Sequence, residues 1–244
     1  MEQFERSELI YGHDAMFKLK QAHVAIFGVG GVGGYVAESL ARSGIGHFTL
    51  VDNDVVSISN INRQIIATVD TIGKAKVELM KERILSINPE ARVETFNMFF
   101  LEENEKDFEF YNFDYVIDCV DTVKAKIALA KISDKNKVPI ISCMGAGNKV
   151  NPMGFVVTDI YKTEMDPLAK VMRSELRKAG VRRLKVVYSH ERPIKPVSHF
   201  EDPNSKKREI PGSNAFVPPA AGLLIASEVV RDLTNDVARD VLKR

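Results

Sequence analysis

Residues 24–63 have the sequence VAIFGVGGVGGYVAESLARSGIGHFTLVDNDVVSISNINR. An apolar run at 24–27 gives way to a glycine-rich turn at 28–34, after which apolar side chains recur at helical spacing. A second apolar run, at 47–51, ends at Asp52. A strand, a tight turn, a helix and a second strand in this order predict a βαβ unit with two parallel strands.

The glycine spacing and the position of Asp52 indicate a nucleotide site. Gly28 permits a sharp turn, Gly30 leaves room for a phosphate beside the backbone, and Gly33 lets the helix pack closely on the strand. N–H groups at the start of the helix attract an anion. Asp52, 19 residues after Gly33, can accept hydrogen bonds from ribose hydroxyls. Such turns also occur for packing alone, and NAD-dependent dehydrogenases use the same pieces, so the nucleotide stays open.

Polar residues after Asp52 favour a triphosphate over NAD. Arg63 offers a planar fork for two phosphate oxygens, and Lys76 offers a mobile charge suited to an α-phosphate. Asp121 ends a buried-strand run and is a carboxylate suited to Mg²⁺ that bridges phosphates. The Gly-Lys pair at 73–74 lacks the other residues of a P-loop. We therefore predict ATP and Mg²⁺ as ligands, with a nucleotide site formed by Gly28, Gly30, Gly33, Asp52, Asn60, Arg63 and Lys76.

The rest of the chain alternates strands and helices. Apolar runs predict strands at 92–95, 115–120 and 138–142, and later at 154–160 and 183–189. Helical spacing predicts helices at 71–88, 122–137, 166–178 and 218–233, one or two helices within 4–20, and a peripheral helix at 101–112. This order predicts an α/β fold with a doubly wound, mostly parallel, Rossmann-like sheet and additional C-terminal strands and helices. Its ligand crevice would lie at the carboxyl ends of the strands.

Two parts of the chain differ in pattern. We predict a nucleotide-binding core with N-terminal helices at 1–153 and a C-terminal part at 154–244, in one continuous domain. Residues 170–208 hold 12 Lys and Arg against 4 Asp and Glu, an excess of +8 in a chain whose net charge is +1. Such an excess is typical of a surface that binds a polyanion, or of a solvated helix face followed by a flexible loop at 190–212.

Composition narrows the class of protein. The chain has 244 residues, 45% of them hydrophobic and 27% charged, which suits a globular fold with a buried core. No apolar run is long enough for a membrane span and no leader pattern is present, so we expect a cytoplasmic protein without a membrane partner. The chain has two cysteines and no CxxC pair, so we expect no disulfide and no zinc site. Cys143 ends a predicted strand and could be a nucleophile, although buried or bystander cysteines are commoner.

Four motifs are similar to those of the ThiF-type superfamily of adenylating enzymes, which are related to ubiquitin activators: GVGGVGG (28–34), VDNDVVSISNINRQ (51–64), GKAK (73–76) and VIDCVD (116–121). Three longer segments resemble the tRNA threonylcarbamoyladenosine dehydratase branch of this superfamily: FERSELIYG (4–12), SINPEARV (86–93) and PGSNAFVPPAAGLLIASEVVRDL (211–233).

The resemblance implies an ATP-dependent dehydratase that adenylates the carboxylate of threonylcarbamoyladenosine in tRNA and promotes its cyclisation. It implies catalytic roles for Arg63, Lys76 and Asp121, and for Arg6 acting in the site of the partner subunit of a homodimer. It also names a cysteine desulfurase system as a partner. Two alternatives stay open: an adenylyltransferase for a ubiquitin-like sulfur carrier, against which the missing CxxC pairs count, and an NAD-dependent oxidoreductase or dinucleotide sensor.

Overall fold

One sheet organises the fold. The computed structural model describes residues 2–197 and 211–241, with side chains up to Thr234. Seven strands lie in the order β3-β2-β1-β4-β5-β7-β6, and only the β6–β7 pair is antiparallel. The strands are β1 (His23–Phe27), β2 (His47–Val51), β3 (Arg92–Phe96), β4 (Tyr115–Asp118), β5 (Ile140–Cys143), β6 (Phe155–Asp159) and β7 (Lys185–Ser189). The predicted α/β fold with a mostly parallel sheet is confirmed.

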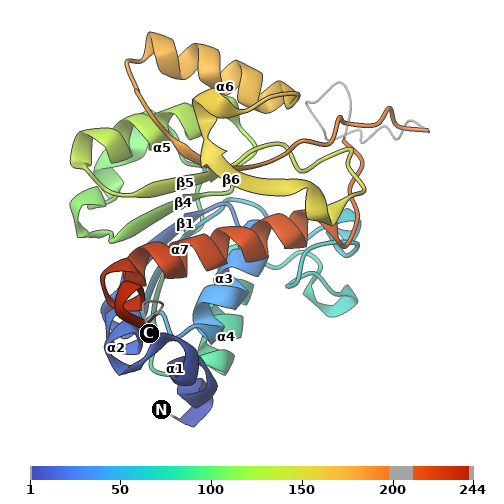
Figure 1. Ribbon diagram of the computed structural model, residues 1–244. Helices are drawn as coiled ribbons and strands as arrows, with labels where there is room; N and C mark the ends of the chain where they lie inside the picture. Colours follow the sequence, from blue (N-terminus) through green and yellow to red (C-terminus); the bar gives the residue numbers. More distant parts are fainter. Residues whose placement is uncertain (1, 198–210, 242–244) are drawn as a thin grey trace.

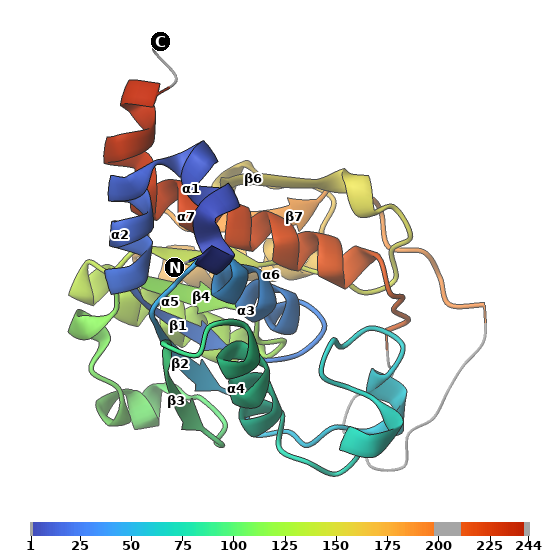
Figure 2. The same cartoon turned by 90° about the horizontal axis from the view of Figure 1, so that it is seen from below.

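Helices cover both faces of this sheet (Figures 1 and 2). They are α1 (Glu5–Tyr11), α2 (His13–Gln21), α3 (Gly33–Arg42), α4 (Lys76–Ile87), α5 (Val123–Asn136), α6 (Pro167–Lys178) and α7 (Val217–Val241). In Figure 1, α3, α4 and α7 lie on one side of the strands, and α5 and α6 on the other. Among the described residues, no helix has both the length and the apolar character that a membrane crossing requires.

The side chains of β1 alternate between two cores, one on each face of the sheet. Val24 and Ile26 are fully buried in the core under α3 and α7, whereas Ala25 and Phe27 are fully buried in a second core beside α5. Side chains of a strand alternate between faces, so a strand that is apolar at every position needs cover on both sides. The continuous apolar run of the sequence is therefore the signature of the doubly wound sheet.

The central strands end at one level. Phe27 of β1 pairs with Val51 of β2 and with Asp118 of β4, and Asp118 pairs with Ser142 of β5. The loops after these four strands consequently leave the same edge of the sheet, where doubly wound folds bind their ligands. Strands β6 and β7 extend this sheet, and the division at residue 153 stays a prediction.

The helix predicted at 71–88 begins later, at Lys76. Gly73 has φ +84°, a left-handed conformation that an α-helix does not accept. Its N–H donates to the carbonyl of Val56 at 2.8 Å, and the N–H of Val56 donates to the carbonyl of Lys74 at 2.9 Å. Lys74 is thus part of an extended turn, and the prediction that it lies in the helix was wrong.

The acidic and aromatic segment at 101–112 forms no regular α-helix. It contains two 3-10 helices, η4 (Glu102–Asp107) and η5 (Phe110–Asn112), and its two phenylalanines turn into the core. Phe108 and Phe110 are buried there and pack around Phe27. The C-terminal helix, predicted to end at residue 233, continues to Val241. Most of the loop predicted at 190–212, residues 198–210, lies outside the described residues.

The N-terminal helices bury fewer apolar side chains than predicted. Phe4, Met16 and Leu19 are buried, but other large apolar side chains of α1 and α2 are exposed: Leu9 by 87%, Ile10 by 70% and Phe17 by 61%. These three exposed side chains are hereafter called the N-terminal apolar surface.

Candidate active site

A cavity of about 760 Å³ lies at the carboxyl ends of β1, β2, β4 and β5. Its walls bring together the glycine turn, the segment after β2, the start of α4, the segment after β4 and the loop after β5. Gly28, Gly30, Asp52, Asn60, Arg63, Lys76 and Asp121 all line it. Of the residues predicted for the site, Gly33 and Arg6 are absent from this lining.

Close approach explains the glycines. Gly28 has φ +91°, and a Cβ added to Gly33 would lie 1.8 Å from the carbonyl oxygen of Gly28. Only glycine therefore lets α3 start directly against the turn. Around Gly30 a Cβ would meet nothing nearer than Gln64 Nε2 at 3.9 Å, so the backbone there borders open space. Gly33 therefore packs against the backbone of Gly28, and Gly30 faces the cavity.

Asp52 fixes the turn as well as lining the cavity. Its Oδ2 accepts the N–H of Val29 at 2.7 Å, and its Oδ1 accepts the N–H of Asp54 at 2.8 Å. One carboxylate thus joins the glycine turn to the segment after β2. A carboxylate oxygen accepts more than one hydrogen bond, so a ribose hydroxyl can still be bound.

Two cations line the same cavity, and the Arg63 side chain lies directly beside the turn, since a Cβ on Gly31 would lie 3.2 Å from Arg63 Cγ. Lys76 is 4% exposed and its Nζ contacts Asp54 Oδ2 at 2.6 Å. Arg63 donates through Nη1 to the carbonyl of Ser59 at 2.9 Å and to Asn62 Oδ1 at 2.8 Å. Burial lowers the pKa of the Arg63 guanidinium, which nevertheless stays charged at neutral pH.

Asn60 supports this segment. Its Oδ1 accepts the N–H of Ser57 at 3.1 Å and completes a capping box around η2 (Ile58–Asn60). The buried amide therefore holds the backbone from which Arg63 extends.

Asp121 lies three residues after the end of β4, exposed at the cavity wall, and Thr122 Oγ1 donates to its Oδ1 at 3.4 Å. Among the described residues, no three His, Cys, Asp or Glu side chains are grouped to hold a metal ion. A single carboxylate fits Mg²⁺, which proteins commonly hold through one or two carboxylates together with nucleotide phosphates. Asp121 fits that requirement, whereas a zinc site would need more protein ligands.

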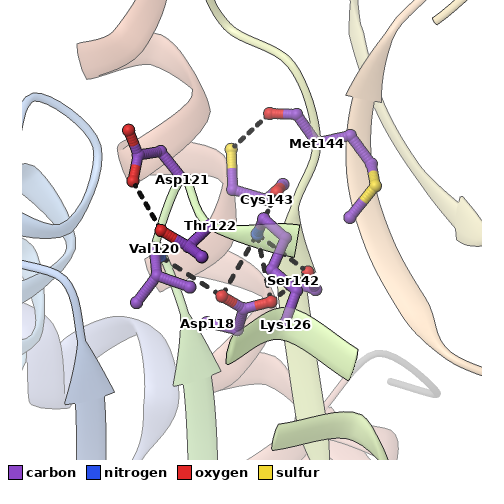
Figure 3. Close-up of polar contacts among 8 residues, drawn as sticks. All are labelled: Asp118, Val120, Asp121, Thr122, Lys126, Ser142, Cys143 and Met144. Atoms are coloured by element: carbon purple, nitrogen blue, oxygen red, sulfur yellow. Dashed lines mark hydrogen bonds and ion pairs between the residues drawn. The ribbon is translucent and has the colours of Figure 1, made fainter. Parts of the chain in front are cut away.

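Behind Asp121 lies a buried ion pair (Figure 3). Lys126 Nζ, from the second turn of α5, contacts both oxygens of Asp118, at 3.1 and 3.0 Å, and the carbonyl of Cys143 at 2.7 Å. The Lys126 side chain is 1% exposed and that of Asp118 is 0% exposed. Asp118 also accepts from Ser142 Oγ and from the N–H of Val120. The pair holds the ends of β4 and β5 together.

A second buried ion pair lies under the loop after β5. Lys149 Nζ contacts Asp166 Oδ2 at 2.9 Å, and both side chains are 0% exposed. Asp166 Oδ1 also accepts the N–H of Ala169 and so caps α6. Residues 144–149 and the start of α6 consequently form one wall of the cavity.

Part of the cavity wall is apolar. It contains Val51, Met98, Phe99, Phe100, Val120 and Ala125. Phe100 is buried, whereas Phe99 is 45% exposed. An apolar wall in the same cavity as Asp52 suits a nucleobase attached to a ribose.

Cys143 is buried rather than exposed at the rim. Burial raises the pKa of its thiol to about 12, and its Sγ donates to the carbonyl of Met144 at 3.3 Å. A buried thiol that stays protonated at neutral pH is a poor nucleophile. The geometry therefore favours a bystander role for Cys143.

Arg6 lies in α1, which packs on α2 and α7. Because α2 leads directly into β1, it ends at the amino end of the sheet, and α1 lies beside it (Figure 2). The cavity is lined by the segments at the carboxyl ends of the strands. Arg6 can contribute to adenylation only in the cavity of another copy of the chain.

Comparison with known proteins gives the family. A sequence model of the ThiF family matches residues 4–243. The chain belongs to the ThiF family. A tRNA threonylcarbamoyladenosine dehydratase of Bacillus subtilis (strain 168) is 47% identical to it over 245 residues, which cover 97% of this chain and 96% of the relative.

Solved structures of the ThiF fold agree with this relationship. The E. coli tRNA N6-threonylcarbamoyladenosine dehydratase TcdA in complex with ATP is 34% identical, with a TM-score of 0.87 and coverage of 98% of this chain and 96% of that chain. The complex of the same E. coli enzyme with AMP gives a TM-score of 0.88 at 35% identity.

The ThiF sequence motifs did not reveal three features of this site. Asp54, which pairs with Lys76, was read only as part of a motif. Neither of the two buried lysines, Lys126 and Lys149, was singled out from the sequence. One signal was available: Lys126 falls on the same helical face as buried Leu129 and Ala130, so its charge requires a buried partner.

Proposed function

We propose that the chain is an ATP-dependent dehydratase that adenylates the carboxylate of threonylcarbamoyladenosine in tRNA and then promotes its cyclisation. The convergence of Arg63, Lys76 and Asp121 on one cavity beside the glycine turn carries the proposal, because this set suits a triphosphate and exceeds what NAD requires. Two ThiF-family dehydratases similar over almost the whole chain support the choice of substrate.

In the first step, ATP lies with its base against the apolar wall and its ribose at Asp52. The glycine turn, Arg63 and Lys76 bind the phosphates. Asp121 would hold Mg²⁺, which when bound would supply positive charge to offset that of the phosphates. The substrate carboxylate attacks the α-phosphorus, the bond to the β-phosphate oxygen breaks, and pyrophosphate leaves with that electron pair. The product is an acyl-adenylate.

In the second step, the ureido group of the same nucleoside attacks the acyl carbon and AMP leaves. No side-chain nucleophile takes part, which agrees with the buried, protonated Cys143. The sum of both steps is a dehydration driven by cleavage of ATP to AMP and pyrophosphate.

The tRNA approaches along α6. This helix starts at the cavity, where Asp166, Pro167 and Leu168 are part of the wall. Further along it and after it, exposed cations follow: Lys170, Arg177, Lys178, Arg182 and Arg183. Lysine and arginine on one surface neutralise phosphates without reading sequence. An RNA backbone bound there would deliver a nucleoside to the open side of the cavity.

The active form is a homodimer in which Arg6 of one subunit reaches the triphosphate of the other. The location of α1 at the amino end of the sheet and the N-terminal apolar surface beside Arg6 support this arrangement. A second copy would bury Leu9, Ile10 and Phe17, which water otherwise contacts. A tRNA substrate supports a cytoplasmic location for the reaction, and a cysteine desulfurase system as partner stays a prediction from the resemblance.

Nucleoside analysis tests this proposal. Purified protein, ATP with Mg²⁺ and tRNA carrying threonylcarbamoyladenosine are incubated, and anticodon-loop nucleosides are measured by mass spectrometry. A product lighter by one water supports the proposal. Pyrophosphate exchange stimulated by a ubiquitin-like sulfur carrier and not by tRNA would identify the carrier-activating alternative. Thermal stabilisation by NAD and not by ATP with Mg²⁺ would identify the dinucleotide-binding alternative.

A further inference from the structure

Two buried ammonium groups hold the loop after β5 by its backbone. Lys126 Nζ contacts the carbonyl of Cys143 at 2.7 Å (Figure 3), and Lys149 Nζ contacts the carbonyl of Gly145 at 2.5 Å. Each ammonium is neutralised by its own buried carboxylate, Asp118 or Asp166. The lysines therefore place positive charge on two carbonyl oxygens without exposing a cation to the cavity.

Peptide planarity gives the orientation of the next donor. In a trans peptide the C=O of Gly145 and the N–H of Ala146 point in opposite directions, and the described chain contains no cis peptide. Since the carbonyl of Gly145 points at Lys149, the N–H of Ala146 points away from that buried ammonium. Ala146 lines the cavity. Its N–H, like those of Gly145 and Gly147, donates to no residue in the described part of the chain.

The same contact strengthens this donor. A carbonyl that accepts a hydrogen bond from an ammonium polarises its peptide unit, so the N–H of that unit becomes a better donor. The loop is also closely confined. A Cβ on Gly145 would lie 2.8 Å from Asp166 Oδ2, and a Cβ on Gly147 would lie 2.9 Å from Pro211 Cβ. A donor held in this way needs little reorganisation when negative charge develops beside it.

We propose that residues 145–147 form an oxyanion site in which the N–H of Ala146 binds the acyl oxygen of the adenylated substrate during ring closure. This inference rests on the proposed dehydratase function. The phosphates are bound by the glycine turn, Arg63 and Lys76, whereas this loop offers uncharged donors on a different wall. Uncharged donors suit an oxygen that is neutral in the acyl-adenylate and negative only while the ring closes.

A ureido nitrogen forms a C–N bond to the acyl carbon, and the carbonyl π electrons move onto the oxygen, which the N–H of Ala146 then stabilises. When the carbonyl re-forms, the bond from carbon to the phosphate oxygen breaks and AMP leaves with that electron pair. The proton of the nitrogen passes to water.

Removal of the Ala146 N–H should slow ring closure and leave adenylation nearly unchanged. Ala146→Pro deletes this N–H, and Val150→Pro is the matched control because the N–H of Val150 donates to Glu191 Oε1 at 2.9 Å, outside the cavity lining. Single-turnover experiments with labelled ATP and modified tRNA follow pyrophosphate release and cyclic product separately. In Ala146→Pro we expect pyrophosphate release within about threefold of wild type and ring closure slower by about 10²-fold, with accumulated acyl-adenylate. In Val150→Pro the ratio of the two rates should match wild type.

An ester bond in place of the 145–146 amide removes the N–H without adding a ring, and covers the case in which the proline variant does not fold. It also weakens the carbonyl of Gly145 as an acceptor for Lys149. It should slow ring closure by about tenfold or more relative to pyrophosphate release. Equal loss of both rates, or no loss of either, in a folded variant overturns the proposal. Absence of cyclic product with the wild-type protein would instead refute the dehydratase function. In that case, the same variants are compared by the ratio of two other rates: acyl transfer from the carboxylate that the protein does adenylate, and pyrophosphate release.

Discussion

Replacement of Lys126 by methionine should destabilise the protein far more than an ordinary lysine substitution. Methionine keeps the length and most of the volume of the side chain but removes the ammonium. The carboxylate of Asp118, which is 0% exposed, then keeps only Ser142 Oγ and the N–H of Val120 as donors. Loss of one partner of a buried ion pair typically costs about 3–5 kcal/mol. For a chain of this size that corresponds to a fall in Tm of about 6–20 °C.

Urea and thermal unfolding measure this effect, with Lys131→Met as the matched control on the same helix. Lys131 pairs with Glu102 at the surface, where the two side chains are 36% and 59% exposed, so its loss should cost under about 1 kcal/mol. The double variant Lys126→Met with Asp118→Asn should recover part of the loss, because no unpaired charge stays buried. If Lys126→Met unfolds like Lys131→Met, or if the double variant is no better than the single one, the ion pair does not hold β4 and β5 together.

Three further results are expected. Asp121→Asn should lower ATP–pyrophosphate exchange by about 10²–10³-fold with Tm changed by less than about 2 °C, since its side chain is exposed at the cavity; unchanged exchange would place the metal elsewhere. Burial, followed by the charge of the stacked His47, lowers the pKa of His23 from 6.5 to about 4. The unfolded chain therefore binds a proton at His23 more readily than the folded protein does, so stability falls as pH drops from about 6.5 to about 4. Urea unfolding measures the difference between the free energies of unfolding at about pH 7 and about pH 4.5. His23→Phe should reduce this difference by roughly 1–2 kcal/mol, a figure lowered to allow for the half-exposed ring. Leu9→Asp should shift the protein towards monomers in light scattering and reduce exchange at low protein concentration, whereas a variant that stays dimeric and fully active would locate the interface on another surface.

The sequence was sufficient for the fold because its decisive signals are local. A glycine turn between an apolar strand and a helix has one common solution, and continuous apolar runs require a sheet covered on both faces. The same logic brought Asp52, Arg63, Lys76 and Asp121 to one edge, where the structure has them lining one cavity. Their catalytic roles stay predictions.

Contacts between distant segments were beyond this local reasoning. Lys149 and Asp166 are separated by 17 positions and meet only because β6 and β7 bring α6 back over the loop after β5. Helical periodicity also failed to anticipate that Gly73 delays α4, since a left-handed glycine depends on the turn that precedes it. The three side chains of the N-terminal apolar surface are exposed, contrary to the rule that apolar side chains pack inward. The proposed homodimer would cover them.

Three buried lysines, Lys76, Lys126 and Lys149, lie in or next to the cavity wall. How each can act depends on how exposed its carboxylate partner is. Lys126 and Lys149 are paired with carboxylates that are 0% exposed, so a ligand that displaced either carboxylate would leave it buried and unpaired at high cost. The Lys76 side chain is also buried, at 6% exposed, but the side chain of its partner Asp54 is 58% exposed. If a phosphate oxygen replaced Asp54 at Nζ, that carboxylate could turn into water at little cost. We therefore expect Lys76 to be the one of these three lysines that contacts the nucleotide, while the other two affect chemistry only through the backbone carbonyls that they hold.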